Sequence, residues 1–486
     1  MSTPARILLV ASEAVPFAKS GGLGDVVGAL AAALRRLGAD TRVVLPFYRA
    51  IRQGGFQTWR HSAGLEGLLH GERTGAGLVE TWGPGGVPVY LVERDDCFDR
   101  PSLYGEGGSA YADNLERFSF FSHAALSVCT AVGFSPHAVH AHDWQTGLAL
   151  ALLDGPLASV PGLEGTRRVF TIHNLAYQGL FPLDALPATG LPPSVLHPGG
   201  IEHFGALSLL KAGIVSADAI TTVSPTYARE ILEPGQGMGM EGTLRYRSGR
   251  LQGILNGLDT AVWDPSTDPA LPARYHPGDM SGKSACRRAL IEALGLDGQV
   301  LDRGPLFGMT TRLTEQKGID LVLGALDALL AMDLGLVVLG TGDPGYEHAL
   351  VEAARRSPGR LAVRIGFDED LAHRIAAGAD AFLVPSRYEP CGLTQLYALR
   401  YGTVPVVRAT GGLADSVVHY DPWRDRGTGF TFGPFSTDAL LGAVREAAML
   451  YRHRERWERL RLAGMHVDVS WERAARTYLS VYGART

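Results

Sequence analysis

The sequence has few cysteines, no long apolar run and no large excess of charge of either sign. Its 486 residues include only four cysteines, which are widely spaced and form no CxxC pair. This spacing argues against a disulfide framework or a zinc ribbon and favours a reducing compartment. No stretch reaches the roughly 18 apolar residues of a membrane-spanning helix. The run 7–11 is too short for a signal peptide and is soon followed by Glu13, so we expect a buried first strand in a cytoplasmic protein.

The charge balance excludes one large class of partner. Lys and Arg number 45 and Asp and Glu number 50, which gives a formal net charge of −5. Binding to nucleic acid needs clustered cations, so we expect no nucleic-acid partner, although a few local cations still permit an anionic small ligand. The 61 glycines and 28 prolines are scattered without a three-residue period, which excludes collagen-like and low-complexity chains.

Short apolar, β-branched runs alternate with segments of helical period along the whole chain. In the first half, strands are predicted at 7–11, 41–45, 89–92, 138–141, 169–172 and 219–223, with a helix over 25–37. In the second half, strands are predicted at 306–309, 335–339, 362–365, 381–384 and 404–407, with helices at 319–331 and 346–356. This alternation is typical of parallel sheets covered on both faces, so we predict two successive doubly wound α/β units.

The boundary between the two units is expected near 253–259. The pair Asn256-Gly257 signals a turn, and the stretch 265–278 is rich in Pro, Asp and Gly. The C-terminal segment 452–482 is strongly charged and has a helical pattern that carries Trp457 and Trp471. We therefore expect one face of this segment to dock on a domain.

A glycine-rich segment, Lys19–Asp25, follows the first strand and opens a helix. Glycines let a ligand approach the backbone, and a helix N-terminus offers free N–H groups, so a phosphate or a sugar is a candidate ligand beside Lys19. The segment matches neither a Walker A loop nor a GxGxxG fingerprint. A plain strand-to-helix turn is the alternative.

Two histidine motifs follow predicted strands of the first half. His140 and His142 point to the same face of a strand, which permits a metal pair, but no third ligand is evident. Contacts to a polar substrate are favoured, with hydrogen-bonded structural histidines as the alternative. His173 and Asn174 stand at the carboxyl end of another strand, where α/β proteins bind ligands. A lone structural histidine is the alternative there.

Two motifs of the second half carry charge to the carboxyl ends of strands. Arg312 and Lys317 precede a helix and suit a diphosphate, with a solvated charged loop as the alternative. Glu389 follows the strand 381–384 and suits sugar hydroxyls or a developing positive charge. A helix-capping turn is the alternative for that residue.

Together these motifs resemble those of bacterial glycogen synthases, which are kin to plant starch synthases. The matching segments occur in order along nearly the whole chain and are Lys-Ser-Gly-Gly-Leu at 19–23, His-Asn-Leu-Ala-Tyr-Gln-Gly at 173–179, Lys-Ala-Gly at 211–213, Thr-Val-Ser-Pro-Thr-Tyr at 222–227, Asn-Gly-Leu-Asp at 256–259, Thr-Glu-Gln-Lys-Gly at 314–318, Glu-Pro-Cys-Gly-Leu-Thr-Gln-Leu at 389–396 and Thr-Gly-Gly-Leu-Ala-Asp at 410–415. Wider retaining GT-B families often carry a second Glu eight positions after the first. Tyr397 stands at that position, which favours the glycogen and starch synthases.

The resemblance implies a GT-B fold, with two Rossmann-like doubly wound domains, a deep cleft between them and a C-terminal helix that crosses back to the first domain. The expected domains are 1–253 and 254–465, with the helix in 466–486. The implied reaction transfers α-glucosyl from ADP-glucose to the non-reducing 4-OH of an α-1,4-glucan, with retention of configuration and with no metal or other cofactor. The expected partners are therefore ADP-glucose and a glucan, and neither nucleic acid nor a membrane.

The resemblance also implies roles for individual residues of this chain. The N-terminal loop would meet the donor through Lys19, Gly22 and Asp25. Contacts to the glucose are expected from Asp143, His173, Asn174 and Asn256, with His173 near the 6-OH. The reacting centre is expected to hold Glu389, Lys317, Arg312 and His173, of which Arg312 and Lys317 clamp the diphosphate. The loop around Glu389 is expected to bind the donor through Cys391, Gly392 and Leu393.

Two positions depart from the family pattern. Phe367 stands where the family often places a Tyr under the adenine, so stacking is retained without the hydroxyl. A core aromatic residue is the alternative for this position. Ser20 stands where bacterial glycogen synthases usually have Thr.

The sequence shows no carboxylate pair for double displacement, so we favour front-face attack with the leaving phosphate accepting the acceptor's proton. Two other functions stay open. One is a related transferase that uses glucose 1-phosphate as acceptor. The other is a non-catalytic glucan-binding protein, against which the intact charged motifs argue.

Overall fold

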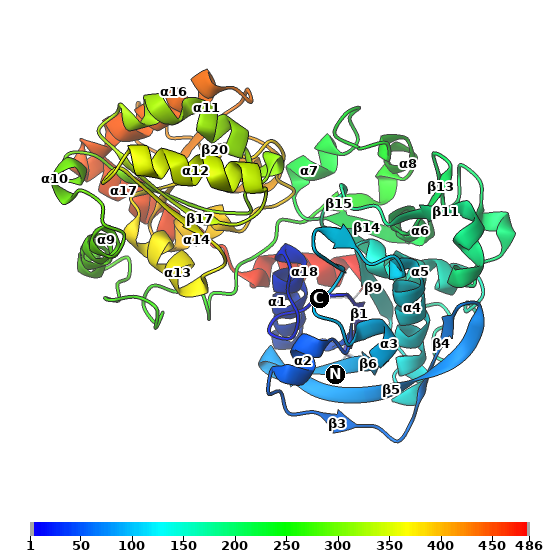
Figure 1. Cartoon of the computed structure of the whole chain (residues 1–486). Helices are drawn as coiled ribbons and strands as arrows, with labels where there is room; N and C mark the ends of the chain where they lie inside the picture. Colours follow the sequence, from blue (N-terminus) through cyan, green and yellow to red (C-terminus); the bar gives the residue numbers. More distant parts are fainter. Residues whose placement is uncertain (1–3, 484–486) are drawn as a thin grey trace. The chain divides into compact units, whose positions relative to one another are not determined.

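The computed structural model describes residues 4–483, which form two compact units (Figure 1). The first unit contains the chain up to Gly257 and again from Trp471 onward, and the second contains Leu258–Ser470. Among the described residues, no helix combines the length and the apolar character needed to cross a bilayer.

A ten-stranded sheet forms the centre of the first unit, and its order is β15-β14-β10-β9-β1-β2-β6-β5-β3, with β4 paired to β5. The parallel strands are β1 (Arg6–Val10), β2 (Asp40–Pro46), β6 (Val87–Glu93), β9 (Ala138–His142), β10 (Arg167–Ile172), β14 (Ala219–Thr222) and β15 (Leu251–Gly253). Their apolar side chains are nearly all buried, as the continuous apolar runs predict for strands covered on both faces.

The edge of this sheet is antiparallel, which the sequence pattern did not indicate. The edge strands are β3 (Trp59–Arg60), β4 (Leu65–Leu69) and β5 (Glu72–Gly83). β5 is long but rich in Gly and charged residues, and its first half is largely exposed. It therefore lacks the apolar run by which the other strands were recognised.

Helices lie on both sides of this sheet. The longer ones are α1 (Gly22–Arg36), α4 (Asn114–Ala131), α5 (Trp144–Asp154), α6 (Leu209–Ser216) and α18 (Trp471–Val481). In Figure 1, α1 and α18 lie on one side of β1 and β9, and α4 and α5 lie on the other. α5 packs between α4 and α6, and α18 packs against α1. The shorter elements are α2 (Arg49–Gln53), α3 (Asp95–Phe98), β7 (Gly105–Glu106), β8 (Ser109–Ala110), β11 (Leu180–Pro182), β12 (Glu202–His203), β13 (Ala206–Ser208), α7 (Pro225–Glu230) and α8 (Glu241–Tyr246).

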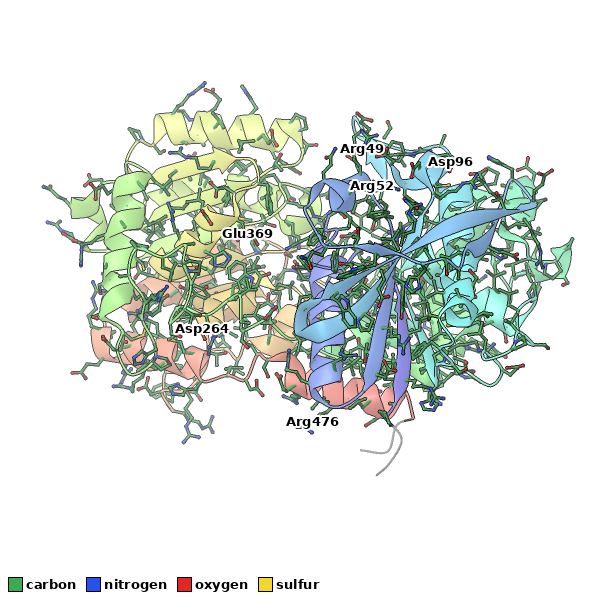
Figure 2. The ribbon with its side chains drawn as sticks, turned by 90° about the horizontal axis from the view of Figure 1, so that it is seen from below. Arg49, Arg52, Asp96, Asp264, Glu369 and Arg476 are labelled. Carbon is green, nitrogen blue, oxygen red and sulfur yellow. The ribbon has the colours of Figure 1, made fainter. Side chains whose placement is uncertain are left out.

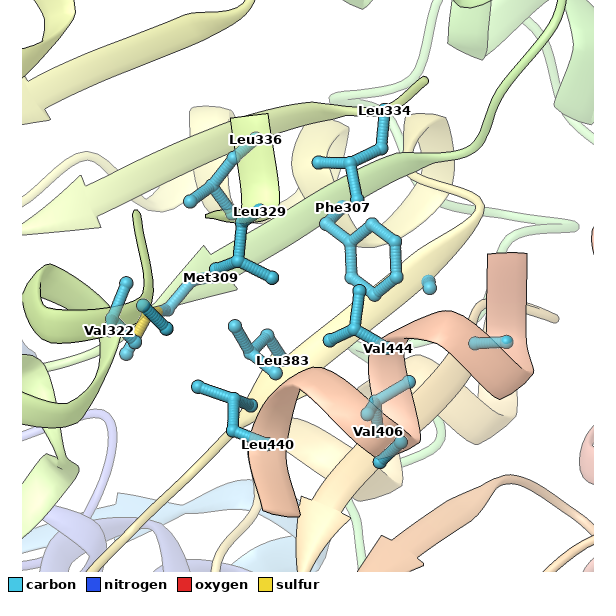
Figure 3. Close-up of a cluster of buried hydrophobic side chains, with 14 of the residues drawn as sticks. Phe307, Met309, Val322, Leu329, Leu334, Leu336, Leu383, Val406, Leu440 and Val444 are labelled. Carbon is cyan, nitrogen blue, oxygen red and sulfur yellow. The ribbon is translucent and has the colours of Figure 1, made fainter. Parts of the chain in front are cut away.

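The second unit is built on a six-stranded, fully parallel sheet of order β18-β17-β16-β19-β20-β21. Its strands are β16 (Leu306–Thr310), β17 (Gly335–Gly340), β18 (Leu361–Ile365), β19 (Ala381–Val384), β20 (Val404–Arg408) and β21 (Phe430–Phe432). Its helices are α9 (Ser281–Ala293), α10 (Gly298–Leu301), α11 (Ile319–Leu330), α12 (Pro344–Arg356), α13 (Glu369–Gly378), α14 (Thr394–Arg400), α15 (Gly411–Ser416), α16 (Thr437–Tyr451) and α17 (Arg454–Met465). Figure 3 shows the main core, in which Phe307 and Met309 of β16 meet Val322 of α11 and Val444 of α16. The predicted class of two doubly wound α/β units is confirmed.

The C-terminal segment differs from the single helical stretch expected over 452–482. It forms two helices, α17 in the second unit and α18 in the first, with 466–470 between them. Within this break, Val469 O accepts a hydrogen bond from Leu258 N at 2.6 Å, and Asp468 Oδ1 accepts one from Ser470 N at 3.0 Å. These contacts replace the helical hydrogen bonds, so the chain is non-helical between α17 and α18.

The C-terminal helix is joined to the centre of the first sheet by a buried hydrogen bond. The hydroxyl of Tyr482 lies 2.8 Å from Nδ1 of His140 on β9, a residue 342 positions earlier in the chain. Both side chains are buried. Loss of this hydroxyl would leave a buried ring nitrogen without its partner.

We therefore predict that Tyr482→Phe lowers the free energy of unfolding of the first unit by about 1–3 kcal/mol, the cost of an unsatisfied buried polar group. Urea unfolding measures the loss, and hydrogen exchange in α18 assigns it to this unit. Arg476→Ala is the matched control, because Arg476 is exposed on α18, the helix that directly precedes Tyr482 (Figure 2), and its loss should change stability by less than about 0.5 kcal/mol. Equal stability of Tyr482→Phe and the parent would show that the bond contributes nothing.

Candidate active site

The predicted site residues of the first unit lie where parallel strands end. β1 leads to Lys19, Gly22 and Asp25; β9 leads to Asp143; and β10 leads to His173 and Asn174. β9 pairs in parallel with both β1 and β10, so the three loops leave from one edge of the sheet. This is the edge at which α/β sheets bind ligands.

A buried carboxylate, Glu13, holds the glycine-rich loop. Its oxygens accept hydrogen bonds from the amides of Ser20 (2.5 Å) and Gly21 (3.2 Å), and from the hydroxyls of Ser20 (2.7 Å) and Tyr104 (2.5 Å). The first two loop amides therefore donate to the protein itself. α1 begins at Gly22 without a side-chain cap, and the first-turn amides of a helix are the groups that its own hydrogen bonds leave available.

The charged residues of this loop also form an internal pair. Lys19 Nζ lies 2.8 Å from Asp25 Oδ1, and both side chains are partly exposed. The structure thus pairs Lys19 with Asp25 across the start of α1, and their contact with the donor stays a prediction. From the sequence, Glu13 is recognised only as an interruption of an apolar run. A carboxylate just after a buried first strand is the signal that could have identified its role.

Three buried histidines stand beside these loops. Nδ1 of His142 lies 3.0 Å from Nε2 of His173, and the rings of His140 and His142 are 4.0 Å apart. Burial lowers the pKa of His173 to about 3 and the pKa values of the other two well below the usual range. All three imidazoles are therefore neutral at physiological pH.

The alternative of a metal pair at His140 and His142 does not fit this geometry. Both ring nitrogens of His140 already face hydroxyls, that of Tyr482 at 2.8 Å and that of Thr171 at 2.6 Å. In the part of the chain that the structure describes, no group of three or more His, Cys, Asp or Glu side chains is arranged to hold a metal ion.

Asp143 and its neighbours fix the backbone at this edge. Asp143 Oδ1 accepts a hydrogen bond from the amide of His173 at 2.7 Å. Burial raises the pKa of the Asp143 carboxyl to about 7, although the amides of His173 and Asn174 favour its charged form. Asn174 accepts a hydrogen bond from the amide of Ala176. Asn256, beyond β15, is buried, and its Oδ1 has no hydrogen-bond partner among the described residues.

In the second unit, Lys317 and Glu389 form a partly buried ion pair. Lys317 Nζ lies 2.6 Å from Glu389 Oε2, and the Ser386 hydroxyl donates to the same oxygen at 2.9 Å. The side chains are 18% and 7% exposed. Lys317, one of the two residues of the predicted clamp, therefore has its charge balanced by Glu389 in this structure. Arg312, the other predicted clamp residue, donates to Gln316 Oε1 at 3.3 Å.

Two glycines make the close approach of these loops possible. Gly318 has φ +72°, and a Cβ there would lie 2.3 Å from the carbonyl oxygen of Pro385. Gly411 has φ +44°, and its Cβ would lie 1.9 Å from the carbonyl oxygen of Glu389. Any larger residue would push the loop of Lys317 or the segment after β20 away from Glu389.

Three further residues predicted to bind the nucleotide-sugar donor, Cys391, Gly392 and Leu393, lie just before α14. Cys391 is buried, and Gln395 Nε2 donates to the carbonyls of Cys391 (3.1 Å) and Gly392 (3.0 Å). Leu393 is the residue before α14. These contacts hold the loop from within the second unit.

Phe367 and Tyr397 have opposite environments. Phe367 follows β18 and is 82% exposed, so the alternative of a core aromatic residue is wrong. Tyr397 stacks on Trp263 with ring centroids 3.6 Å apart, and Trp263 stacks on His373 at 3.8 Å. The position where wider families often carry a second Glu thus belongs to an aromatic stack.

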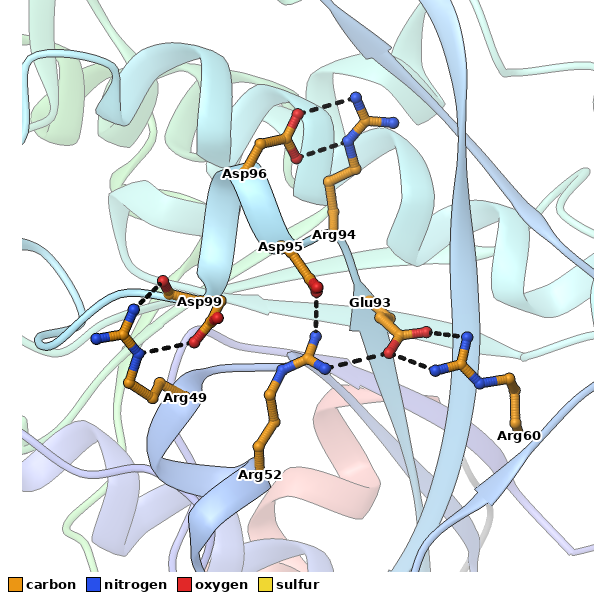
Figure 4. A network of polar contacts seen from close by, with 8 residues as sticks. All are labelled: Arg49, Arg52, Arg60, Glu93, Arg94, Asp95, Asp96 and Asp99. Carbon is orange, nitrogen blue, oxygen red and sulfur yellow. Dashed lines mark hydrogen bonds and ion pairs between the residues drawn. The ribbon is translucent and has the colours of Figure 1, made fainter.

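A network of alternating charges lies near the ends of β2 and β6 and was not predicted from the sequence (Figure 4). Arg52 bridges Glu93 (3.2 Å) and Asp95 (2.5 Å), and Arg60 reaches Glu93 at 2.7 Å. Arg94 pairs with Asp96 at 2.7 Å. Part of this network lines a groove of about 620 Å³. Arg52 and Arg60 thus tie α2 and β3 to Glu93 at the end of β6.

Comparison with known proteins agrees with this architecture. Residues 6–246 match the family described as "Starch synthase catalytic domain", and residues 298–460 match "Glycosyl transferases group 1". The chain is 52% identical to a glycogen synthase of Anaeromyxobacter dehalogenans strain 2CP-C, over 98% of this chain and 99% of that protein. It is 46% identical to glycogen synthase 2 of Geobacter sulfurreducens, over 98% of each chain.

A solved structure shows the same fold. The catalytic domain of starch synthase IV from Arabidopsis thaliana, bound to ADP and acarbose, superimposes with a TM-score of 0.92. The two chains are 34% identical, and the match covers 99% of each. With full-length identity of 52% to a glycogen synthase and matching family models in both units, the chain belongs to the glycogen and starch synthase family of glycosyltransferases.

Proposed function

We propose that the protein transfers α-glucosyl from ADP-glucose to the 4-OH at the non-reducing end of an α-1,4-glucan, with retention of configuration and release of ADP. The observation that carries this proposal is the partly buried Lys317–Glu389 pair, in a chain that is 52% identical to a glycogen synthase. A cation held at the carboxyl ends of parallel strands suits a nucleotide diphosphate. We also propose that the protein acts in the cytoplasm, as its composition suggests.

The residues of the second unit are proposed to bind the nucleotide. Arg312 and Lys317 contact the diphosphate, and the loop of Cys391, Gly392 and Leu393 contributes backbone contacts. The diphosphate gains negative charge as the glycosidic bond breaks, so cations directed at it stabilise the transition state more than the ground state. Lys317 is already held in place by Glu389, which lowers the reorganisation needed when the donor binds.

The residues of the first unit are proposed to bind the glucosyl group. Asp143, His173, Asn174 and Asn256 offer hydrogen bonds to hydroxyls, together with the first turn of α1 and the Lys19–Asp25 pair. The transition state of glycosyl transfer has oxocarbenium character. A neutral His173 can hold a hydroxyl without placing a positive charge near this centre, which is consistent with its lowered pKa.

Front-face attack is the proposed route to retention. Double displacement needs a free carboxylate as nucleophile. Glu389 is bound by Lys317 and Ser386, and Tyr397 is held in an aromatic stack. We therefore assign Glu389 to positioning Lys317 and balancing developing positive charge. The leaving phosphate then accepts the acceptor's proton.

The donor and acceptor assignments predict a clear order of activities. We expect kcat/KM for ADP-glucose to exceed that for UDP-glucose by at least about tenfold with glycogen as acceptor. Incorporation of labelled glucose into glycogen measures both kcat/KM values, and a parallel reaction offers glucose 1-phosphate as the acceptor. Equal or faster turnover with UDP-glucose would refute the assignment of ADP-glucose as donor. A maltose phosphate product formed in preference to longer glucan would refute the acceptor.

Lys317→Ala is predicted to lower kcat by about 10²–10³-fold, the scale for one transition-state electrostatic partner. It should also lower the thermal midpoint, because Glu389 is left buried and unpaired. The double variant Lys317→Ala/Glu389→Gln separates the two effects, since it removes the unpaired charge. We expect the double variant to regain stability and not activity. Recovery of kcat in the double variant would mean that Lys317 is only a structural counterion.

Phe367→Ala is predicted to raise the KM for ADP-glucose by about 5- to 150-fold, since stacking on a base contributes roughly 1–3 kcal/mol. Phe367→Tyr keeps the ring and should change little. Trp423→Ala is the control, because Trp423 is a 95% exposed aromatic residue of the same unit. Thermal midpoints should not move, since neither ring is buried. An unchanged donor KM in Phe367→Ala would place the adenine elsewhere.

A further inference from the structure

The environment of His142 bears on which ring nitrogen of its neighbour His173 carries the proton. His142 Nδ1 lies 3.0 Å from His173 Nε2, so one of these two nitrogens carries the proton between them. His142 Nε2 is buried and has no hydrogen-bond partner among the described residues. His140, whose tilted ring lies 4.0 Å from that of His142, already uses both of its nitrogens on Tyr482 and Thr171.

Only two neutral arrangements of this pair are possible. In the first, His142 carries its proton on Nδ1 and donates to His173 Nε2, which leaves a bare lone pair at the buried His142 Nε2. In the second, His173 donates from Nε2, and His142 must carry its proton on Nε2, as a buried N–H without an acceptor. Buried N–H groups without a partner are rarer in proteins than buried acceptors without a donor. The first arrangement is therefore favoured.

We propose that His142 is a positioning residue that holds His173 in the tautomer protonated at Nδ1. His173 Nε2 then accepts the proton of His142, and the remaining proton of His173 sits on Nδ1. This nitrogen makes no hydrogen bond to the residues that the structure describes. His173 thus offers a ligand a neutral hydrogen-bond donor and no acceptor.

The backbone contacts of His173 support the same role. Its amide donates to Asp143 Oδ1 at 2.7 Å, so the main chain and the ring are fixed by two adjacent residues, Asp143 and the last residue of β9, His142. A flip of the ring, which would exchange Nδ1 for Nε2, breaks the hydrogen bond to His142. The ligand group that meets His173 must therefore accept a hydrogen bond, as a sugar hydroxyl oxygen does.

The tautomer is testable without substrate. Histidine ¹⁵N spectra of the full chain distinguish a protonated ring nitrogen from a bare one, and the spectrum of His173→Asn identifies the signals of His173 by their loss. We expect Nδ1 of His173 to be protonated and Nε2 to be bare at neutral pH. A proton on Nε2 of His173, or rapid exchange between the two forms, would overturn the proposal.

The effect on donor binding rests on the proposed function, and two variants of similar size test it. His142→Asn retains a side-chain N–H near the position of Nδ1, whereas His142→Leu does not. We expect His142→Leu to raise the KM for the nucleotide sugar that the enzyme turns over by about 3- to 10-fold, the scale of one hydrogen bond, and to mix the tautomers of His173. His142→Asn should restore both. If both variants raised KM equally, in proportion to their loss of thermal midpoint, the role of His142 would be merely structural. This outcome can be read with whichever nucleotide sugar is the donor, so it is separate from a failure of the ADP-glucose assignment.

Discussion

The parallel pairing of neighbouring strands is the constraint on which the rest of this structure depends. Parallel strands end at the same edge of a sheet, so loops far apart in the sequence are delivered to one place. In the first unit this brings the His173 amide to Asp143 over a separation of 30 residues. In the second it brings Lys317 to Glu389 over 72 residues. Without that pairing, each group would be an isolated charge or ring.

At the carboxyl ends of the strands in both sheets, charged side chains are paired with partners within the protein. Lys19 pairs with Asp25, Lys317 pairs with Glu389, and Glu13 receives amides and hydroxyls. A partly buried charge is costly unless it is paired and hydrogen-bonded. The protein thus holds Lys19 and Lys317 in fixed positions, and the diphosphate of the proposed function would share Lys317 with a carboxylate. This arrangement fixes the position of each cation but weakens its attraction for an anionic ligand.

The histidines follow the opposite rule. They are buried and neutral, and hydrogen bonds to hydroxyls and to each other fix their orientation. The end of the chain takes part, since Tyr482 of the C-terminal segment completes the hydrogen bonds of His140. The same unit therefore depends on both ends of the chain. A neutral ring held in one orientation can direct a hydrogen bond without adding a positive charge. This suits a reaction that develops positive charge at the sugar.

Local patterns in the sequence determined the fold class of this protein and most of its central strands. Continuous apolar runs predicted the central strands and the α/β class, and the order of the motifs indicated the family. Patterns of this kind report which face of an element is buried and nothing about its distant partners. The antiparallel β5, whose exposed first half lacks an apolar run, was missed for that reason. Only the tertiary structure decided that Glu13 holds Ser20 and Gly21, that Lys317 is paired with Glu389, and that Phe367 is exposed. Each of these depends on a distance between groups that no spacing along the chain encodes.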